Sequence, residues 1–142
     1  MKASLRIAAL CLAAATLAGC ALSVSPEVTI GGHKIEPYVA DTPAERDDGL
    51  QGFDGLAAGE GMVFVYPDAE VRTFGIKDVA FPIDVVFIGP DLKVSGIVPL
   101  SPGDDTRIKS PGPAPFAVEL PHGWAAEKGI GVGSEFVYEE SR

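Results

Sequence analysis

The segment Ile83-Asp84-Val85-Val86-Phe87-Ile88 sets the architecture of this 142-residue chain. Four consecutive apolar residues follow Asp84, and such a run predicts a strand that is buried on both faces of a sheet. Gly89-Pro90-Asp91 then predicts a turn, and residues 94–98 predict the next strand. We therefore expect short strands joined by tight turns.

Further strands are expected on both sides of this segment. Residues 28–30 and 33–39 flank Gly31-Gly32, which is a hairpin signal because both glycines accept the positive φ of tight turns. Pro37 predicts that the second of these strands lies at an edge of the sheet, since proline cannot donate to the ladder. Residues 101–115 are expected to form a proline-rich loop. The remaining strands are predicted over residues 62–66, 116–120 and 135–138.

Two short helices accompany the predicted strands. Thr42-Pro43-Ala44-Glu45 offers a capping threonine, a proline suited to the first helical position and a glutamate that can complete a capping box. Gly49 is placed to end this helix. A second helix is expected over residues 123–128, ending at Gly129. This order of elements predicts a mainly β protein with two short helices (β-rich α+β), folded as a compact small barrel or sandwich.

The first twenty residues have the form of an export signal. Two positive charges precede an apolar run over residues 7–17, which is shorter than the about 20 residues of a transmembrane helix. Leu17-Ala18-Gly19-Cys20 resembles the lipobox of bacterial lipoproteins, in which the cysteine is lipidated and the chain is cut before it. We expect a signal peptide over residues 1–19, a lipidated tether over 20–27 and a single domain over 28–142. An ordinary cleaved signal with an incidental cysteine is the alternative.

Composition limits the possible partners. From Cys20 onward, 123 residues remain, with nine basic against twenty acidic residues and a net charge of −11. This charge argues against nucleic acid and against anionic lipid head groups, so membrane attachment should rest on the acyl anchor alone. Ala21 lacks the aspartate that commonly retains lipoproteins at the inner membrane, which favours the periplasmic face of the outer membrane. After loss of Cys11 the domain has no disulfide, so its stability depends on its apolar core.

Short motifs spread over residues 39–137 match a known family in order and spacing. They are Ala40-Asp41-Thr42-Pro43-Ala44-Glu45-Arg46 with Gly49-Leu50; Gly61-Met62-Val63-Phe64-Val65; Phe74 with Lys77; Pro82-Ile83-Asp84 with Phe87-Ile88; Ser110-Pro111-Gly112-Pro113-Ala114; Val118-Glu119-Leu120-Pro121 with Gly123; and Gly129-Ile130 with Gly133. The chain thus resembles the bacterial and archaeal family called domain of unknown function 192. The resemblance implies a compact β-rich fold, often exported, with no established activity. The family's usual Trp-Met after the phenylalanine is Gly75-Ile76 here.

Four ionisable residues are candidates for a ligand-binding site, namely Arg46, Lys77, Asp84 and Glu119. Asp84 shares a strand face with Val86 and Ile88, so its carboxylate is expected to be partly desolvated and to need a cation or several N–H donors. A polar pocket of the four groups would bind a ligand or perform acid–base chemistry. The structural alternative, which we favour, is that these charges pair with one another or that Asp84 caps backbone amides at the turn.

Glu119 and Arg46 approach this predicted pocket from different elements. Alternation along residues 116–120 places Glu119 on the face opposite the core-facing Phe116, Val118 and Leu120. Arg46, on the surface of the first helix, is able to reach Glu119 or a ligand. A solvated helix charge is the alternative for Arg46.

No catalytic, metal or cofactor motif can be assembled from this sequence. His33 and His122 have no companions at metal-ligand spacing, so we expect neither a metal nor a cofactor. No serine lies in a Gly-x-Ser-x-Gly motif, and no free cysteine remains for a Cys–His pair. We expect an envelope lipoprotein that binds a small molecule or an envelope protein without catalysis. The alternatives are a hydrolase of envelope material that uses Lys77 and Asp84, and a structural surface protein without a ligand.

Overall fold

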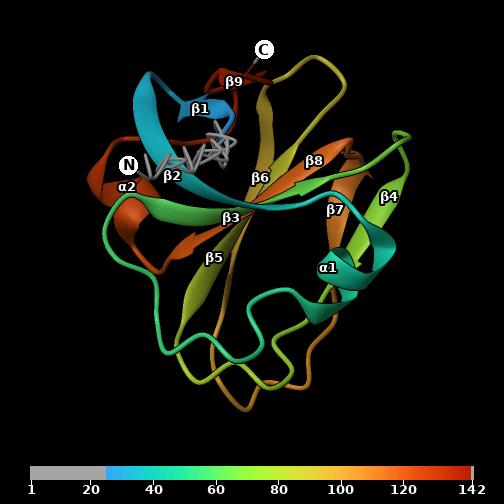
Figure 1. Cartoon of the computed structure of the whole chain (residues 1–142), viewed down its shortest axis with the longest axis vertical. Helices are drawn as coiled ribbons and strands as arrows, with labels where there is room; N and C mark the ends of the chain where they lie inside the picture. The colour runs from blue at the N-terminus through green and yellow to red at the C-terminus, as the bar shows by residue number, and fades with distance from the viewer. Residues whose placement is uncertain (1–24, 142) are drawn as a thin grey trace, which may run out of the picture.

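A computed structural model describes residues 25–141, so the predicted signal peptide over residues 1–19 and the lipidation site Cys20 lie outside it. The described part of the chain is built mainly from strands, with two short helices (Figure 1). In chain order the elements are β1 (Glu27–Ile30), β2 (His33–Ala40), α1 (Pro43–Asp48), β3 (Glu60–Val65), β4 (Val71–Phe74), β5 (Ile83–Ile88), β6 (Val94–Leu100), β7 (Ile108–Pro113), β8 (Phe116–Pro121), α2 (Trp124–Glu127) and β9 (Phe136–Glu139).

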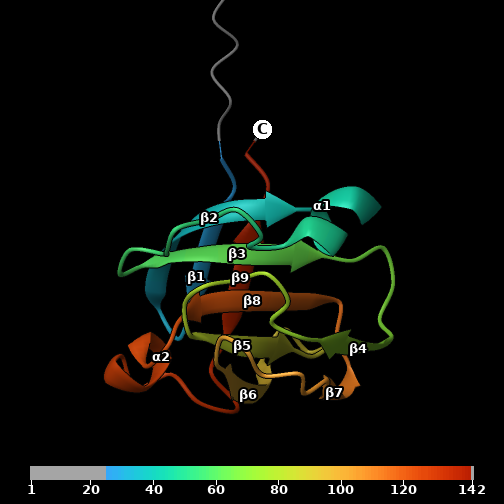
Figure 2. The ribbon, with the colours of Figure 1, turned by 90° about the horizontal axis from the view of Figure 1, so that it is seen from below.

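Seven strands form one curled sheet in the order β6-β5-β8-β3-β2-β1-β9. Its strand pairs are antiparallel except for β2 and β3, which run parallel. The two ends of the sheet meet where Lys93 pairs with Glu135 and where the N–H of Val94 donates to the carbonyl of Ser134. Figure 2 shows β2, β3, β8, β5 and β6 stacked in this order, with β1 and β9 crossing them. The sheet is therefore a half-closed barrel, which confirms the predicted β-rich fold.

The β1–β2 hairpin forms as predicted, with positive φ at Gly31 (57°) and Gly32 (78°). The prediction that the second strand lies at a sheet edge is wrong, because β2 pairs with β1 on one side and with β3 on the other. Pro37 is tolerated because β1 pairs only with residues 33–35. The N–H of Glu36 donates toward β3, to Gly59, so the proline nitrogen faces the side that β1 leaves unpaired.

Both predicted helices are confirmed. In α1 the N–H of Glu45 donates to Oγ1 of Thr42, and the N–H of Thr42 donates to the Glu45 carboxylate, which completes the capping box. The helix ends at Gly49, as predicted. Within residues 25–141, no helix has the length and apolar character needed to span a bilayer.

A second, two-stranded sheet of β4 and β7 was not predicted. Residues 108–113, expected as part of a loop, form β7, and β4 pairs with it antiparallel. The Oγ of Ser110 accepts a hydrogen bond of 2.9 Å from the N–H of Arg72, which joins the two strands. Pro111 and Pro113 are compatible with β7 because this strand has a partner on one side only. Its formation therefore depends on tertiary contacts that residue type alone does not indicate.

Hydrophobic clusters cover both faces of the central strands. One cluster fills the inside of the curl and includes Ile30, Val86, Val118 and Phe136. The other lies on the outer face, where Leu50, Phe64 and Phe74 pack against Val85, Phe87 and Ala117. All six residues of β5 are buried, which confirms the prediction for this strand. The outer cluster, with α1 and β4 at its margin, contains the candidate site.

Candidate functional site

A hollow of about 1050 Å³ opens on the outer face of the sheet. Side chains of α1 line one side, residues 73–79 after β4 and residues 103–107 before β7 line the others, and β3 and β8 contribute Phe64, Tyr66 and Glu119. Figures 1 and 2 both place α1 and β4 at the same end of the sheet, with α2 at the other end. Cavities that hold small molecules have about 300–1,000 Å³, so this hollow is large enough for one.

Glu119 is the most deeply buried ionisable side chain of this hollow, with 5% of its surface exposed. It lies on β8 opposite Met62 of β3 and Val85 of β5. Its Oε2 is the one buried side-chain nitrogen or oxygen within residues 25–141 that has no hydrogen-bond partner. Burial raises the pKa of Glu119 to about 8, so the carboxyl group is mostly protonated at neutral pH.

The predicted alternation along β8 is confirmed, but the face that carries Glu119 is covered by a second hydrophobic cluster. Phe116, Val118 and Leu120 face the cluster inside the curl, and Glu119 faces the other side. That other side is also covered, because Phe74 of β4 and Leu50 after α1 close over it. Glu119 is therefore buried.

Arg46 contacts backbone and an aromatic ring. Its Nη1 donates to the carbonyl of Val65 at 2.9 Å and also to the carbonyl of Asp41. The guanidinium lies 5.2 Å from the centre of the Tyr66 ring, and Arg72 covers the same ring at 3.8 Å. Desolvation raises the pKa of Tyr66, although both arginines oppose this shift. Arg46 thus holds the end of β3 against α1 and is half-buried, unlike a solvated helix charge.

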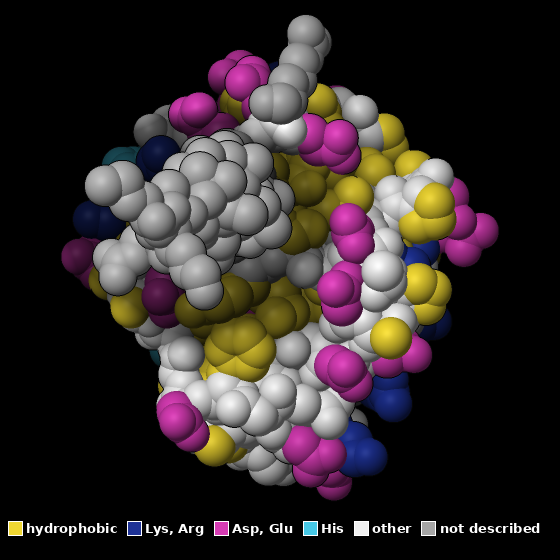
Figure 3. Space-filling model, in the orientation of Figure 1, with side chains coloured by type: hydrophobic (Ala, Val, Ile, Leu, Met, Phe, Trp, Pro, Cys, Tyr) yellow, Lys and Arg dark blue, Asp and Glu magenta, His cyan; other side chains and the backbone are white. Residues whose placement is uncertain are grey.

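Lys77 lies at the rim of the hollow and is largely in solvent. Its side chain is 87% exposed, and Nζ lies 3.9 Å from Oδ2 of Asp78. Figure 3 shows acidic side chains predominating over basic ones on the face that carries α1. The rim of the hollow carries three cations, Arg46, Lys77 and Arg107, against five carboxylates, Asp47, Asp48, Asp78, Asp104 and Asp105.

The structure places Asp84 away from the other three candidates. It pairs across strands with Leu120, so it faces the inside of the curl, and it does not line the hollow. Its Oδ1 lies 2.8 Å from Nδ1 of His122, and its Oδ2 accepts a 2.8 Å hydrogen bond from the N–H of Gly123 at the start of α2. Asp84 thus accepts from a backbone amide, as one of the alternatives predicted, but this amide belongs to the start of α2 and not to the turn beside Pro82.

The pairing of Lys77 with Asp84 is wrong. Asp84 is satisfied by His122 and Gly123, and Lys77 is exposed beside Asp78. The reason is that Asp84 faces the inside of the curl, whereas Lys77 lies in the loop between β4 and β5, beside the hollow on the outer face. The structure thus brings together Arg46, Lys77 and Glu119, but it does not assemble the carboxylate–amine pair on which the hydrolase alternative depended.

Among residues 25–141, no three side chains of His, Cys, Asp or Glu gather closely enough to hold a metal ion.

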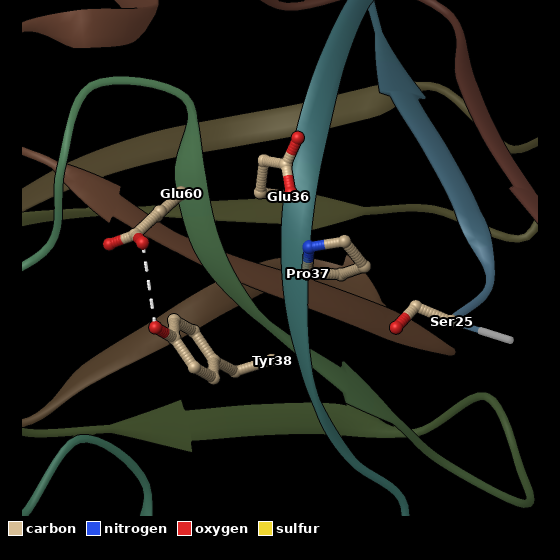
Figure 4. Close-up of a pocket in the computed structure, with 5 residues that line it drawn as sticks. All are labelled: Ser25, Glu36, Pro37, Tyr38 and Glu60. Atoms are coloured by element: carbon tan, nitrogen blue, oxygen red, sulfur yellow. Dashed lines mark hydrogen bonds between the residues drawn. The ribbon is translucent and has the colours of Figure 1, made fainter. Parts of the chain in front are cut away.

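A second, smaller hollow of about 190 Å³ lies at the unpaired side of β2, beside Pro37 (Figure 4). There the Tyr38 hydroxyl donates to Glu60 at 3.5 Å. Sequence reasoning did not single out Tyr66 or Phe74 of the larger hollow, because single aromatic residues at strand ends are common core residues.

The fold and the hollow define a β-rich, half-barrel protein with a hollow of ligand size on the outer face of its sheet. The chain belongs to the domain of unknown function 192 family, described as "Uncharacterized ACR", which matches residues 26–138. It is similar to a crystal structure of a protein of unknown function from Novosphingobium aromaticivorans DSM 12444, with 31% identity, a TM-score of 0.75, and coverage of 78% of this chain and 83% of that chain. A Sinorhizobium meliloti 1021 protein described as a candidate transcription regulator is 25% identical with a TM-score of 0.75, covering 81% of this chain and 96% of that chain. No curated protein is significantly similar.

Proposed function

We propose that this protein is a non-enzymatic module that binds a small molecule in the hollow lined by Arg46, Lys77 and Glu119. The observation that carries the proposal is the buried, unpartnered Oε2 of Glu119 in a hollow of ligand size. Leaving a buried polar group unpaired costs about 1–3 kcal/mol, and polar groups of this kind are normally paired within the protein. A bound molecule that supplies the missing hydrogen bond would remove this cost.

Binding is favoured over the other classes for physical reasons. The Lys77 and Asp84 of the hydrolase alternative lie on different faces of the sheet and have other partners. The regulator description belongs to the Sinorhizobium meliloti protein, whereas a net charge of −9 disfavours contact between this chain and DNA. A structural protein without a ligand offers no reason to keep an unpaired carboxyl group in an apolar cluster.

The test is a fragment screen by NMR on the full chain. Binding should shift the amide signals of residues that line the hollow, such as Tyr66, Phe74 and Glu119, and should saturate. Gly75→Trp places a large side chain on the wall of the hollow and should weaken or abolish these shifts. A Cβ at Gly75 meets its nearest atoms, on Arg107 and Thr106, at 3.8 Å, so the backbone at this position has room for a side chain.

Gly55→Trp is the matched control for this variant. Gly55 has open space around it and lies outside the hollow, so fragment binding should persist. A screen in which no fragment shifts the signals of the hollow, or in which Gly75→Trp binds as well as the unchanged protein, would refute the proposal.

We also propose that the domain is held at the cell envelope by a lipid on Cys20, on the periplasmic face and in the outer membrane. The lipobox-like Leu17-Ala18-Gly19-Cys20 and the residue Ala21 support this proposal. Replacing Cys20 by serine should release the protein from membranes in cell fractionation, since an acyl anchor then has no attachment point. Unchanged membrane association of Cys20→Ser would contradict it.

A further inference from the structure

We propose that the ligand of the hollow is an organic amine, bound as its ammonium cation with an N–H group directed at the carboxylate of Glu119. This inference rests on the binding function proposed above and names the chemical class of its ligand. It follows from three features of the hollow, namely the unsatisfied acceptor at its base, the aromatic walls and the sign of the charge at its rim.

The base of the hollow lacks a hydrogen-bond donor. Oε2 of Glu119 is completely buried and without a partner, and its neighbours on the sheet, Met62 and Val85, supply no polar side chain. An ammonium group carries both the N–H donors that this oxygen needs and the charge that would stabilise an ionised carboxylate. A neutral hydroxyl group would supply only the hydrogen bond.

The walls suit the carbon skeleton and the charge of such a ligand. Phe64 and Phe74 line the hollow and pack edge to face, with ring centres 5.0 Å apart. Leu50 and Ile76 extend this apolar wall. Aromatic faces attract cations, and the attraction is larger where the cation is desolvated, as it would be beside Glu119.

The rim favours a cation over an anion. Its carboxylates outnumber its cations by five to three, and the chain as a whole has a net charge of −9. Two of the three rim cations already have neighbours within the protein. Nη1 of Arg46 already donates to two backbone carbonyls, and Lys77 lies beside Asp78. An anionic ligand would thus meet a negative field and few available donors.

Binding of an ammonium ion should be linked to a proton. Because burial raises the pKa of Glu119 to about 8, most molecules carry a neutral carboxyl group at pH 6 and must release a proton to form the ion pair. Affinity for the amine should therefore rise as the pH approaches 8. A neutral or anionic ligand would not follow this pattern.

The experiment compares benzylamine, benzyl alcohol and benzoate, which share a ring and differ in charge. Each is titrated into the full chain at pH 6 and pH 8, with NMR reporting the site and calorimetry the affinity. Benzylamine should bind in the hollow and should bind at least about tenfold more tightly at pH 8 than at pH 6. Glu119→Gln should weaken it by about tenfold or more and remove the pH dependence.

Glu127→Gln is the matched control, since it removes the same charge from α2, at the opposite end of the sheet (Figure 2). It should leave benzylamine binding unchanged. Calorimetry in buffers of different ionisation enthalpy should detect about one proton released per benzylamine bound near pH 6 by the unchanged protein. This measurement tests the inference even if Glu119→Gln does not fold.

The experiments distinguish a wrong ligand class from a wrong binding function. If benzyl alcohol or benzoate binds in the hollow as tightly as benzylamine, the ligand class is wrong and the binding function stands. The ligand class is also wrong if benzylamine binds without proton release, or if fragments from the screen bind the hollow and benzylamine does not. If neither fragments nor benzylamine shift the signals of the hollow, both the inference and the proposed function fail.

Discussion

Asp84 and Glu119 are buried carboxyl groups that lie on opposite faces of the same pair of strands, β5 and β8. Asp84 is 6% exposed and has two partners, a ring nitrogen of His122 and the backbone N–H of Gly123. Glu119 is buried to a similar degree, but its Oε2 has no partner. Asp84 fastens the start of α2 to the sheet, whereas no such structural task is visible for Glu119.

Burial to the same degree therefore affects stability differently at Asp84 and at Glu119. A buried carboxylate with an N–H donor and an imidazole partner contributes to stability, while an unpaired one reduces it. Departures from good local chemistry in an otherwise consistent fold are expected where function requires them. The inside of the curl, around Asp84, is accordingly the region where a buried carboxylate has structural partners, and the outer face, around Glu119, is the region for which we propose ligand binding.

The largest difference should appear in the pH dependence of stability. The folded-state pKa of Glu119, about 8, lies above the ordinary glutamate value of 4.5, so the folded protein retains a proton that the unfolded chain releases between these values. The contribution is fully present below pH 4.5 and is lost as the pH rises through 8. Relative to Glu119→Gln, the unchanged protein should lose up to about 1.4 kcal/mol of unfolding free energy per pH unit.

Urea unfolding of both proteins between pH 5 and pH 9 measures this difference. The curves of unfolding free energy should diverge up to about pH 8 and run parallel above it. Parallel curves over the whole range would mean that Glu119 is not the buried, unpaired group described here, and the comparison with Asp84 would lose its basis.

Asp84→Ala should have the next largest effect. The substitution removes the acceptor of the Gly123 N–H and the partner of His122, so we expect a loss of about 2–3 kcal/mol in unfolding free energy. Asp84→Asn keeps an oxygen for Gly123 and should lose less. Urea unfolding at pH 7 gives both values. A loss below about 0.5 kcal/mol for Asp84→Ala would show that this carboxylate does not hold α2.

Glu119→Met should have the opposite sign. Methionine has a similar length and no polar oxygen, so the variant removes an unpaired group from an apolar cluster. At pH 5, where the carboxyl group is protonated in the folded protein, we expect unfolding free energy to rise by about 1 kcal/mol, measured as a higher urea midpoint. A clear destabilisation would indicate that Glu119 has a structural partner and that it stabilises the fold as Asp84 does.

The strand faces that Asp84 and Glu119 occupy can be predicted from the sequence. Alternation along β8 correctly assigns Glu119 to the face opposite Phe116, and the apolar run of β5 correctly predicts burial on both faces. The same alternation places Asp84 on the face of Val86, where the structure has it. Local pattern was sufficient because strand faces follow a period of two residues.

The partners of these groups could not be predicted in the same way. Phe74 of β4 belongs to the cluster that covers the face of Glu119, and β4 pairs with the proline-rich β7, whose sequence has the composition of a loop. The contact between Asp84 and His122 joins residues that are 38 positions apart. Pro37 shows the same limit, since a strand that pairs with β1 through its first residues and with β3 through its later ones has no signature in residue type.

Lys77→Ala should have the smallest effect, and it tests whether Lys77 belongs to either region. A buried Lys77–Asp84 pair would lose about 3–5 kcal/mol on truncation, whereas a lysine that is 87% exposed should change unfolding free energy by less than about 0.5 kcal/mol. The double variant with Asp84→Ala should equal the sum of the single variants to within about 0.5 kcal/mol, because the two residues share no partner. A larger coupling energy, measured by urea unfolding, would connect the rim of the hollow to the carboxylate beneath α2 and would remove the separation between the two faces.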